Sequence, residues 1–369
     1  MNPQEEFCPN MECPDRGKIG NGNIVCHSQK EKRCRCKTCG KTFSVRKGTA
    51  LYGIKKDAKL FVMVVTLLAF GCPVQAIVMA IGLDERTVRT WWLKSGEQSE
   101  RVHESVIETN QLDLQHVQAD EIKVKTRGGT IWMGLVMMVS TRLWLGGVVS
   151  PKRDADLIEQ LVAKIRQVAL CRELLLAVDG LVSYVKAFQK AFRSPHRTGN
   201  LGRPRLIAWD GIQIVQVVKQ RTPKPFQIMR RIVQGREQTI QDLLQRSRGG
   251  AVINTAYIER LNATFRQRIS SLTRRSRQAA SQQKTLHASM YLVGTIYNFC
   301  VPHHSLRLPL WLSERRRHWV QRTPAMATGL TDHIWTVEEL MTFKVVPQPY
   351  VPPKRRGRPP KRRILEVAA

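Results

Sequence analysis

An alternation of strand-like and helix-like segments in the middle of the sequence constrains the fold of this chain most. Three stretches carry the β-branched and apolar residues typical of strands, namely residues 116–124, 131–140 and 143–149. Short turns separate them, Gly128-Gly129 after the first and Ser140-Thr141-Arg142 after the second. The first part of this segment is therefore expected to be three strands in succession.

A helix, a fourth strand and a second helix are expected next. Apolar side chains recur at helical spacing over residues 157–165, behind Asp154 or Asp156 as the N-cap. Leu174 to Val178 is wholly apolar and ends at Asp179-Gly180, which is typical of a buried strand, and residues 182–192 return to helical spacing.

Later segments complete this pattern. Residues 212–218 are strand-like, and a long helix without Gly or Pro is expected from about Asn254 until Gly294. Three strands, a helix, a fourth strand and further helices match the order of a ribonuclease-H-like domain, which is an α/β fold.

Composition divides the whole chain into four regions. We expect a zinc-ribbon-like element, a helix-turn-helix domain, the ribonuclease-H-like catalytic domain with an insertion at about 195–250, and a basic C-terminal region; these cover residues 1–50, 51–110, 111–302 and 303–369. Sixty Lys and Arg against 29 Asp and Glu give a net charge of +31, which favours a polyanionic partner such as nucleic acid.

Three acids occupy the places that two-metal phosphoryl transfer requires in such a domain. Asp120 lies in the first strand, Asp179 ends the fourth, and Glu259 lies on the late helix. Asp120 and Asp179 stand in apolar company, where an unpaired carboxylate is costly, so metal ligation is favoured. Glu121 is the rival of Asp120 but is expected on the opposite face of its strand. Asp210 is the rival of Asp179, which is preferred because it directly follows an apolar strand and precedes a helix.

The amino-terminal cysteines predict a structural zinc site. Six of the nine cysteines lie within residues 8–39, and no secretory signal opens the chain, so metal ligation is favoured over disulfides. Cys8 and Cys13 form one pair and Cys36 and Cys39 a second, and four thiolates suit tetrahedral zinc. Cys26, His27 and Cys34 lie between the pairs and are alternative ligands. Surrounding Lys and Arg residues indicate phosphate contacts.

Residues 60–83 contain no charge and are long enough to span a membrane, but Gly71-Cys72-Pro73 interrupts them. We expect two buried helices joined by a turn, and no membrane span.

The second of these helices and a third that begins behind Asp84 as N-cap form a helix-turn-helix pattern. Its outward residues Arg86, Thr87, Arg89 and Thr90 are then candidates for DNA contact, whereas three-helix packing without DNA is the alternative.

The basic tail carries one further motif. Arg356-Gly357-Arg358-Pro359 lies within a run of Lys and Arg and resembles an AT-hook, in which an extended Arg-Gly-Arg segment enters a narrow A·T minor groove. A nonspecific basic tail is the alternative. Residues 305–345 contain no sequence pattern from which we predict a mechanism.

Residues 254–277, NTAYIERLNATFRQRISSLTRRSR, resemble the glutamate helix of bacterial DDE-class insertion-sequence transposases, closest to the insertion-sequence-one-like group. The segments around Asp120-Glu121, around Val178-Asp179-Gly180 with Tyr184, and the zinc-ribbon segment from Cys36 to Ser44 are also similar. The resemblance covers roughly residues 8–300. One departure is the spacing of 79 residues between Asp179 and Glu259, which exceeds that of compact members.

The resemblance implies a transposase that binds element ends and carries out DNA strand cleavage and transfer with Mg²⁺ or Mn²⁺. It also implies a basic residue seven positions after the glutamate, where Arg266 stands within reach of a phosphate. Asn262 and four arginines, Arg268, Arg274, Arg275 and Arg277, would extend a phosphate-binding stripe. The expected partner is double-stranded DNA, bound by a homo-oligomer in the bacterial cytoplasm at the nucleoid. The alternatives are a catalytically inactive DNA-binding protein or repressor of transposase origin, and a structure-specific nuclease.

Overall fold

The computed structural model describes residues 2–126, 129–197, 202–220, 227–272, 282–313 and 316–352. Its internal contacts divide the chain into two compact units. One unit is Met1–Gly48 together with Val346–Ala369, and the other is Thr49–Val345.

The smaller unit is built on a three-stranded antiparallel sheet. Its strands are β1 (Ile24–Ser28), β2 (Arg33–Cys36) and β3 (Thr42–Ser44), in that order across the sheet. Ile24 and Phe43 are the large apolar side chains of its core, and the other buried members are cysteines. A core this small does not stabilise a fold on its own, so the unit needs a further cross-link such as a metal.

The larger unit begins with three helices, α1 (Ala58–Ala69), α2 (Val74–Ile81) and α3 (Glu85–His103), and α3 continues as a π-helical turn, Glu104–Glu108. Gly71 breaks the apolar segment at φ +85°, so the prediction of two helices joined by a turn is confirmed. The prediction that both are buried was wrong for α2, in which Ile77 is the one buried residue and Met79 is 85% exposed, because that helix packs along one side only. Across the described residues, none of the helices has both the length and the apolar character needed to cross a membrane.

The helix-turn-helix pattern has the predicted local structure. Gly82 ends α2 in the left-handed conformation at φ +69°, and the Asp84 side chain caps α3 by accepting from the Arg86 and Thr87 amides. Ile77, Leu83, Val88 and Trp91 are buried in the shared core. The third helix runs to His103, beyond the helix-turn-helix pattern, and packs against α8 (Gln283–Phe299).

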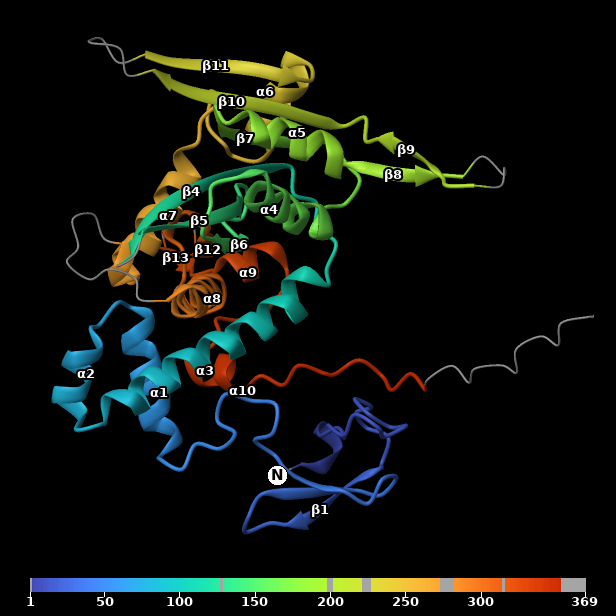
Figure 1. Ribbon diagram of the computed structural model, residues 1–369, viewed down its shortest axis with the longest axis vertical. Coiled ribbons are helices and arrows are strands. Elements are labelled where there is room, and N and C mark those ends of the chain that lie inside the picture. Colours follow the sequence, from blue (N-terminus) through green and yellow to red (C-terminus); the bar gives the residue numbers. More distant parts are fainter. Residues whose placement is uncertain are drawn as a thin grey trace, which may run out of the picture. The chain divides into compact units, whose positions relative to one another are not determined.

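A six-stranded mixed sheet lies at the centre of the larger unit, in the order β11-β10-β7-β4-β5-β6 (Figure 1). Its strands are β4 (His116–Thr126), β5 (Gly129–Met138), β6 (Trp144–Ser150), β7 (Leu174–Asp179), β10 (Ile212–Gln220) and β11 (Gln227–Gln234). Neighbours are antiparallel except β4 with β7 and β7 with β10, which are parallel. The predicted α/β class is confirmed, and β10 shows that part of the stretch 195–250 belongs to the sheet itself.

Helices cover both faces of this sheet. The core on one face joins α4 (Ala155–Val168) and α5 (Val182–Ala191) to odd-numbered residues of β4 and even-numbered residues of β7. On the opposite face, the even-numbered residues of β4 contact α7 (Ala256–Arg268) and α8, and the odd-numbered residues of β7 contact α6 (Glu237–Arg246). Alternation along each strand therefore decides which helix each candidate side chain meets.

One long helix from Asn254 to Gly294 is not formed, so that prediction was wrong. The helix α7 ends at Arg268, a 3-10 turn follows at Ser270–Leu272, and α8 starts at Gln283. The sequence at the break is Ile269-Ser270-Ser271, and β-branched and hydroxyl side chains favour non-helical backbone. The absence of Gly and Pro alone was too weak a criterion.

The remaining elements are two hairpins and short helices. One hairpin pairs β8 (Arg193–His196) with β9 (Arg205–Ala208), and the other pairs β12 (Leu308–Ser313) with β13 (Arg316–Val320). Two helices, α9 (Pro324–Thr328) and α10 (Val337–Thr342), follow the second hairpin. Trp335 stacks between Phe299 and Phe343, with ring centroids 4.6 and 5.1 Å away, so this region is part of the larger unit's core.

Candidate functional site

A cavity lined by several charged side chains opens at the carboxyl end of β7. Its volume is 1180 Å³. The side chains that line it come from β4, β7, β10, α7 and the segment before α4; the charged and amide members are Asp120, Arg153, Asp179, Lys219, Glu259, Asn262, Arg266 and Gln267. The four residues predicted for catalysis, Asp120, Asp179, Glu259 and Arg266, all belong to this set.

The register of two parallel strands brings the first two acids together. Hydrogen-bonded pairing of β4 with β7 covers only residues 116–118, and its last pair is Gln118 with Ala177. Two residues further on, the same register sets Asp120 beside Asp179, where β7 ends. The side chains share a face, because even-numbered residues of β4 and odd-numbered residues of β7 turn to the α6 and α7 side.

Three carboxylates gather at this corner. One oxygen each from Asp120, Glu121 and Asp179 lies within 4.8 Å of the other two, close enough to share a cation. Glu121 does face the other helix layer, as alternation predicts, because Tyr184 of α5 donates a hydrogen bond to it. The predicted opposite face is therefore confirmed, but β4 extends past the end of β7, so carboxylates from both faces meet around that end.

Arg153 links two of these acids. Its Nη2 lies 2.6 Å from Glu121 Oε2 and 2.9 Å from Asp179 Oδ2. Its Nε also donates to Glu121 Oε2 at 2.9 Å. Burial raises the pKa of the Glu121 carboxyl, and the Tyr184 hydroxyl and the Arg153 charge act against that rise. Glu121 therefore has a complete set of protein partners.

Among the described residues, the hydrogen-bond partners of Asp120 are neutral. The Glu121 amide donates to Oδ1 at 2.9 Å and Asn262 Nδ2 donates to Oδ2 at 2.7 Å. Burial, followed by the charge of Glu121, raises the pKa of the Asp120 carboxyl from 3.8 to about 6. Asn262 is 1% exposed, so it supports this acid inside the cavity and does not extend an exposed stripe.

Glu259 lies across the cavity on the first turn of α7. Lys219, at the end of β10, and the Thr255 hydroxyl both donate to its Oε1. Burial acts to raise the pKa of this carboxyl, but those two donors outweigh it and the pKa is lowered. Glu259 thus lines the cavity without belonging to the tight group of three acids. Arg266, two turns further along α7, lines the same cavity.

Asp210 lies away from this site. It is exposed and precedes β10, whose first residue, Ile212, pairs with Leu174 at the start of β7. Asp210 and Asp179 therefore lie at opposite ends of β7, whose six residues end with Asp179 itself. Of the two rivals, only Asp179 lines the cavity.

Sequence reasoning missed the two cations, Arg153 and Lys219. Lone basic residues resemble solvated surface residues in a sequence. A usable signal existed for Lys219, because it follows an apolar strand in the way that Asp179 does, and β10 runs parallel to β7. Arg153 directly precedes the N-cap Asp154, but that position alone does not indicate a partner.

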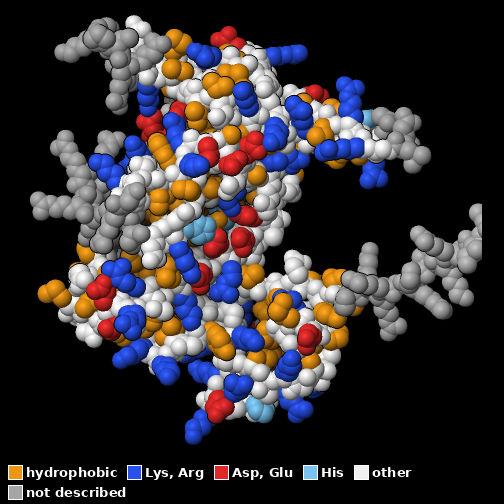
Figure 2. Space-filling model, viewed as in Figure 1, with side chains coloured by type: hydrophobic (Ala, Val, Ile, Leu, Met, Phe, Trp, Pro, Cys, Tyr) orange, Lys and Arg blue, Asp and Glu red, His pale blue; other side chains and the backbone are white. Residues whose placement is uncertain are grey.

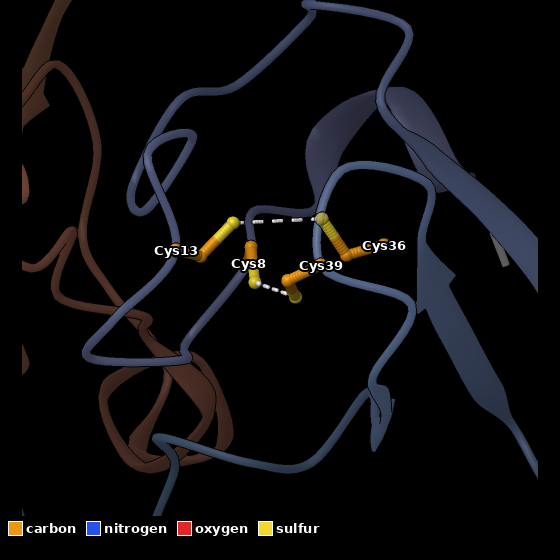
Figure 3. A group of neighbouring side chains, drawn as sticks. All are labelled: Cys8, Cys13, Cys36 and Cys39. Atoms are coloured by element: carbon orange, nitrogen blue, oxygen red, sulfur yellow. Dashed lines mark hydrogen bonds between the residues drawn. The ribbon is translucent and has the colours of Figure 1, made fainter.

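A second candidate metal site lies in the smaller unit (Figure 3). Cys8, Cys13, Cys36 and Cys39 direct their sulfurs toward one another, all within 4.8 Å. The Sγ atoms of Cys8 and Cys39 are 3.6 Å apart and those of Cys13 and Cys36 are 3.8 Å apart. A tetrahedral Zn²⁺ bound at about 2.3 Å places its sulfurs roughly 3.8 Å apart, so the group fits this ion.

The alternative ligands do not join the group. Cys26 is exposed and contacts Gln29, and neither His27 nor Cys34 belongs to the four-sulfur cluster. The four residues between Cys8 and Cys13, two more than between Cys36 and Cys39, are thus compatible with a compact site.

Residues predicted to contact DNA lie in several environments. Arg86, Arg89 and Thr90 are exposed on α3, Thr87 is half-buried, and Arg89 pairs with Glu85 at 2.6 Å. Arg268 is half-buried, with Cζ 4.5 Å from the centroid of the Phe70 ring. Arg274, Arg275, Arg277, Arg356 and Arg358 lie outside the described residues. Lys and Arg side chains are widely distributed over the visible face, and acidic side chains are fewer (Figure 2).

Comparisons with known proteins identify no family. No protein-family model matches this chain, and a comparison with curated proteins finds no match.

Proposed function

We propose that this protein is a DNA transposase of the DDE type, with Asp120, Asp179 and Glu259 as metal-binding catalytic acids and Arg266 as a phosphate-binding residue. The observation that carries the proposal is that these four residues line one cavity. Residues from a first strand, the end of a fourth strand and a late helix line one cavity of 1180 Å³ with the predicted arginine. A DNA-binding protein without catalysis has no need of acids in these three places.

The sheet supports the proposed ribonuclease-H-like fold. Without β11, its order is β6-β5-β4-β7-β10, which is third, second, first, fourth and fifth in the chain. The first three strands are antiparallel, and the fourth and fifth run parallel to the first. Asp179 ends β7 and Asp120 lies beside it on β4, and the carboxyl end of a parallel strand is where α/β proteins commonly place functional groups.

The donor set at the cavity fits hard divalent cations. Carboxylate oxygens are the ligands that Mg²⁺ and Mn²⁺ prefer, and Asp120 has no cationic partner among the described residues. When bound there, the metals activate the attacking oxygen and neutralise charge on the scissile phosphate. Asn262 holds the Asp120 carboxylate in orientation, and Arg266 binds a phosphate from the wall of the cavity.

The other elements support a DNA substrate. A net charge of +31 favours binding of duplex phosphates, and α3 offers exposed Arg86 and Arg89 next to a capped N-terminus, as recognition helices do. The four-cysteine cluster, with zinc as the proposed ion, would hold a small basic unit in one conformation. We propose action as a homo-oligomer on double-stranded element ends and target DNA in the bacterial cytoplasm.

Substitution of the second acid tests this function. Asp179→Asn removes a negative charge from the metal site, so it should abolish Mg²⁺-dependent strand cleavage and strand transfer while leaving binding of element ends unchanged. Asp210→Asn is the matched control, because Asp210 is exposed and lies at the other end of β7 and β10, and it should keep full activity.

Three outcomes would contradict the proposal. Strand transfer by Asp179→Asn at the unchanged rate would remove this acid from the mechanism. End binding by the unchanged protein, without cleavage in either Mg²⁺ or Mn²⁺, would favour a repressor, and cleavage without joining of the 3′-hydroxyl would favour a nuclease.

A further inference from the structure

The hairpin of β12 and β13 combines aromatic and cationic side chains that the acidic cavity does not use. Residues 303–322 contain five arginines, three histidines, two tryptophans and a single acid, Glu314. The base of the hairpin is tied to the fold, because the His303 amide donates to the Arg322 carbonyl at 2.9 Å and the His303 ring contacts Tyr297 of α8.

The strand register places both tryptophans on one face of the hairpin. Pro309 pairs with Trp319, and Trp311 pairs with Arg317. Alternation along the strands puts Arg307 on this face as well, whereas Leu308, Leu310, His318 and Val320 occupy the other face.

The four charged and aromatic groups of the first face form a continuous stack. Arg307 Cζ lies 3.9 Å from the centroid of the Trp319 ring, and Arg317 Cζ lies 4.4 Å from the same ring. Arg317 Cζ is also 5.6 Å from the centroid of Trp311. The order is therefore Arg307, Trp319, Arg317 and Trp311, in which each guanidinium contacts an indole face.

The outer end of this stack is exposed to solvent. Trp311 is 61% exposed, whereas the structural tryptophans Trp144 and Trp335 are 0% and 7% exposed. Leu308 and Leu310 on the other face are each 47% exposed. Trp311 therefore presents most of its indole surface to any ligand that approaches the hairpin.

We propose that this hairpin binds single-stranded nucleic acid by stacking an unpaired base on Trp311, with Arg307 and Arg317 contacting the neighbouring phosphates. An indole offers a flat apolar face on which a base can stack, and the guanidinium groups beside it can pair with the negatively charged phosphates. The hairpin therefore has one group for the base and one for the backbone of a nucleotide. The charge of residues 303–322 also favours a polyanionic ligand, because this segment contains five arginines and one acid. The site is distinct from the acidic cavity and does not depend on its chemistry.

Duplex DNA fits this face less well. Its bases are stacked on one another, so an indole ring finds no free base face except at an unpaired end or an opened base pair. Arginines alone are sufficient for duplex phosphates. In the proposed transposase, the natural ligand would be a base exposed at a cleaved or opened element end.

The experiment compares binding of a 20-nucleotide oligo-dT and a 20-base-pair blunt duplex to the full chain. Trp311→Ala should weaken oligo-dT binding roughly 5- to 150-fold, which is about 1–3 kcal/mol for one stacked base, and should change duplex binding less than about twofold. Trp311→Phe keeps a ring and should retain most of the affinity. Leu310→Ala, on the opposite face of the same strand, is the matched control and should bind oligo-dT as the unchanged protein does.

Photocrosslinking locates the contact. An oligo-dT with one 5-iodouracil should crosslink to the peptide that contains Trp311 or Trp319. Unchanged oligo-dT affinity in Trp311→Ala, an equal loss on duplex and single strand, or crosslinks confined to other peptides would each overturn the proposal. Asp179→Asn should still bind oligo-dT, so failure of the proposed catalytic function is distinguishable from failure at the hairpin.

Discussion

Asp120→Asn should stabilise the protein in the absence of divalent cations and remove its response to Mg²⁺. The rise of the Asp120 pKa from 3.8 to about 6 means that the ionised carboxylate destabilises the folded state, at pH 7.5, by up to about 3 kcal/mol. Because the side chain is partly solvated, we expect a gain of about 1–3 kcal/mol, or roughly 2–6 °C in melting temperature.

The hydrogen bonds around the side chain permit this exchange. The Asn oxygen can still accept from the Glu121 amide, as Asp120 Oδ1 does at 2.9 Å. The new amide nitrogen would face Asn262 Nδ2, but Asn262 Oδ1 is buried and has no hydrogen-bond partner among the described residues, so rotation of the Asn262 amide by half a turn restores a donor and an acceptor.

The pH dependence has a defined sign. Between about pH 4 and 6 the folded state binds more protons at Asp120 than the unfolded state does, so the stability of the unchanged protein should fall as pH rises through this window. Asp120→Asn lacks this titration, and the difference between the two proteins should therefore grow with pH and be complete above about pH 7.

Tryptophan fluorescence is the suitable assay, because all eight tryptophans lie in Thr49–Val345 and report only the larger unit. Chelators are avoided, since they would also remove the zinc proposed for the cysteine cluster; Mg²⁺ is removed by dialysis and added back. Mg²⁺ should raise the melting temperature of the unchanged protein and of Asp210→Asn, and should not raise that of Asp120→Asn. A lower melting temperature for Asp120→Asn without Mg²⁺, or an unchanged Mg²⁺ response, would refute the reasoning.

Three other outcomes are expected. Cys36→Ser should abolish binding of one Zn²⁺ per chain, measured by elemental analysis, whereas exposed Cys26→Ser should leave it intact. Arg86→Ala should lower affinity for selected element ends by about 1–3 kcal/mol and affinity for random duplex much less, and an equal loss on both would mean that α3 contacts only the backbone. Gly96→Ala should lower the melting temperature, because a Cβ there would lie 2.6 Å from the Ala288 backbone in α8 and such overpacking, about 1–3 kcal/mol, outweighs the helix-propensity gain of about 0.5–1 kcal/mol.

Elements with a strong local pattern could be predicted from the sequence. Alternation or apolar runs identified β4, β7 and β10, and helical spacing behind Asp154 identified α4, whose N-cap accepts from the Leu157 amide. The three acids and Arg266 were chosen from their order along the chain and from family resemblance, and they line one cavity.

Features that depend on tertiary pairing could not be predicted in this way. Glu121 joins the acidic group only because β4 pairs with β7 over three residues and then continues past its end. The end of α7 at Arg268 and the Arg–Trp stack of β12 and β13 likewise depend on register and on contacts between distant residues. Alternation in the sequence predicts which face of the sheet each side chain occupies, but it does not predict how far the neighbouring strand extends.

Asp120 and Glu121 are adjacent acids on β4, and their different partners separate a structural carboxylate from a candidate metal ligand. Burial raises the pKa of both. Glu121 is compensated by the Tyr184 hydroxyl and the Arg153 guanidinium, so its charge is already matched inside the protein. Asp120 receives only two neutral donors, and no Lys or Arg of the described residues pairs with it. A buried carboxylate without a cation is costly, and an external divalent cation is the direct way to offset that cost. For this reason Asp120, and not its more buried neighbour, is the expected metal ligand of the first strand.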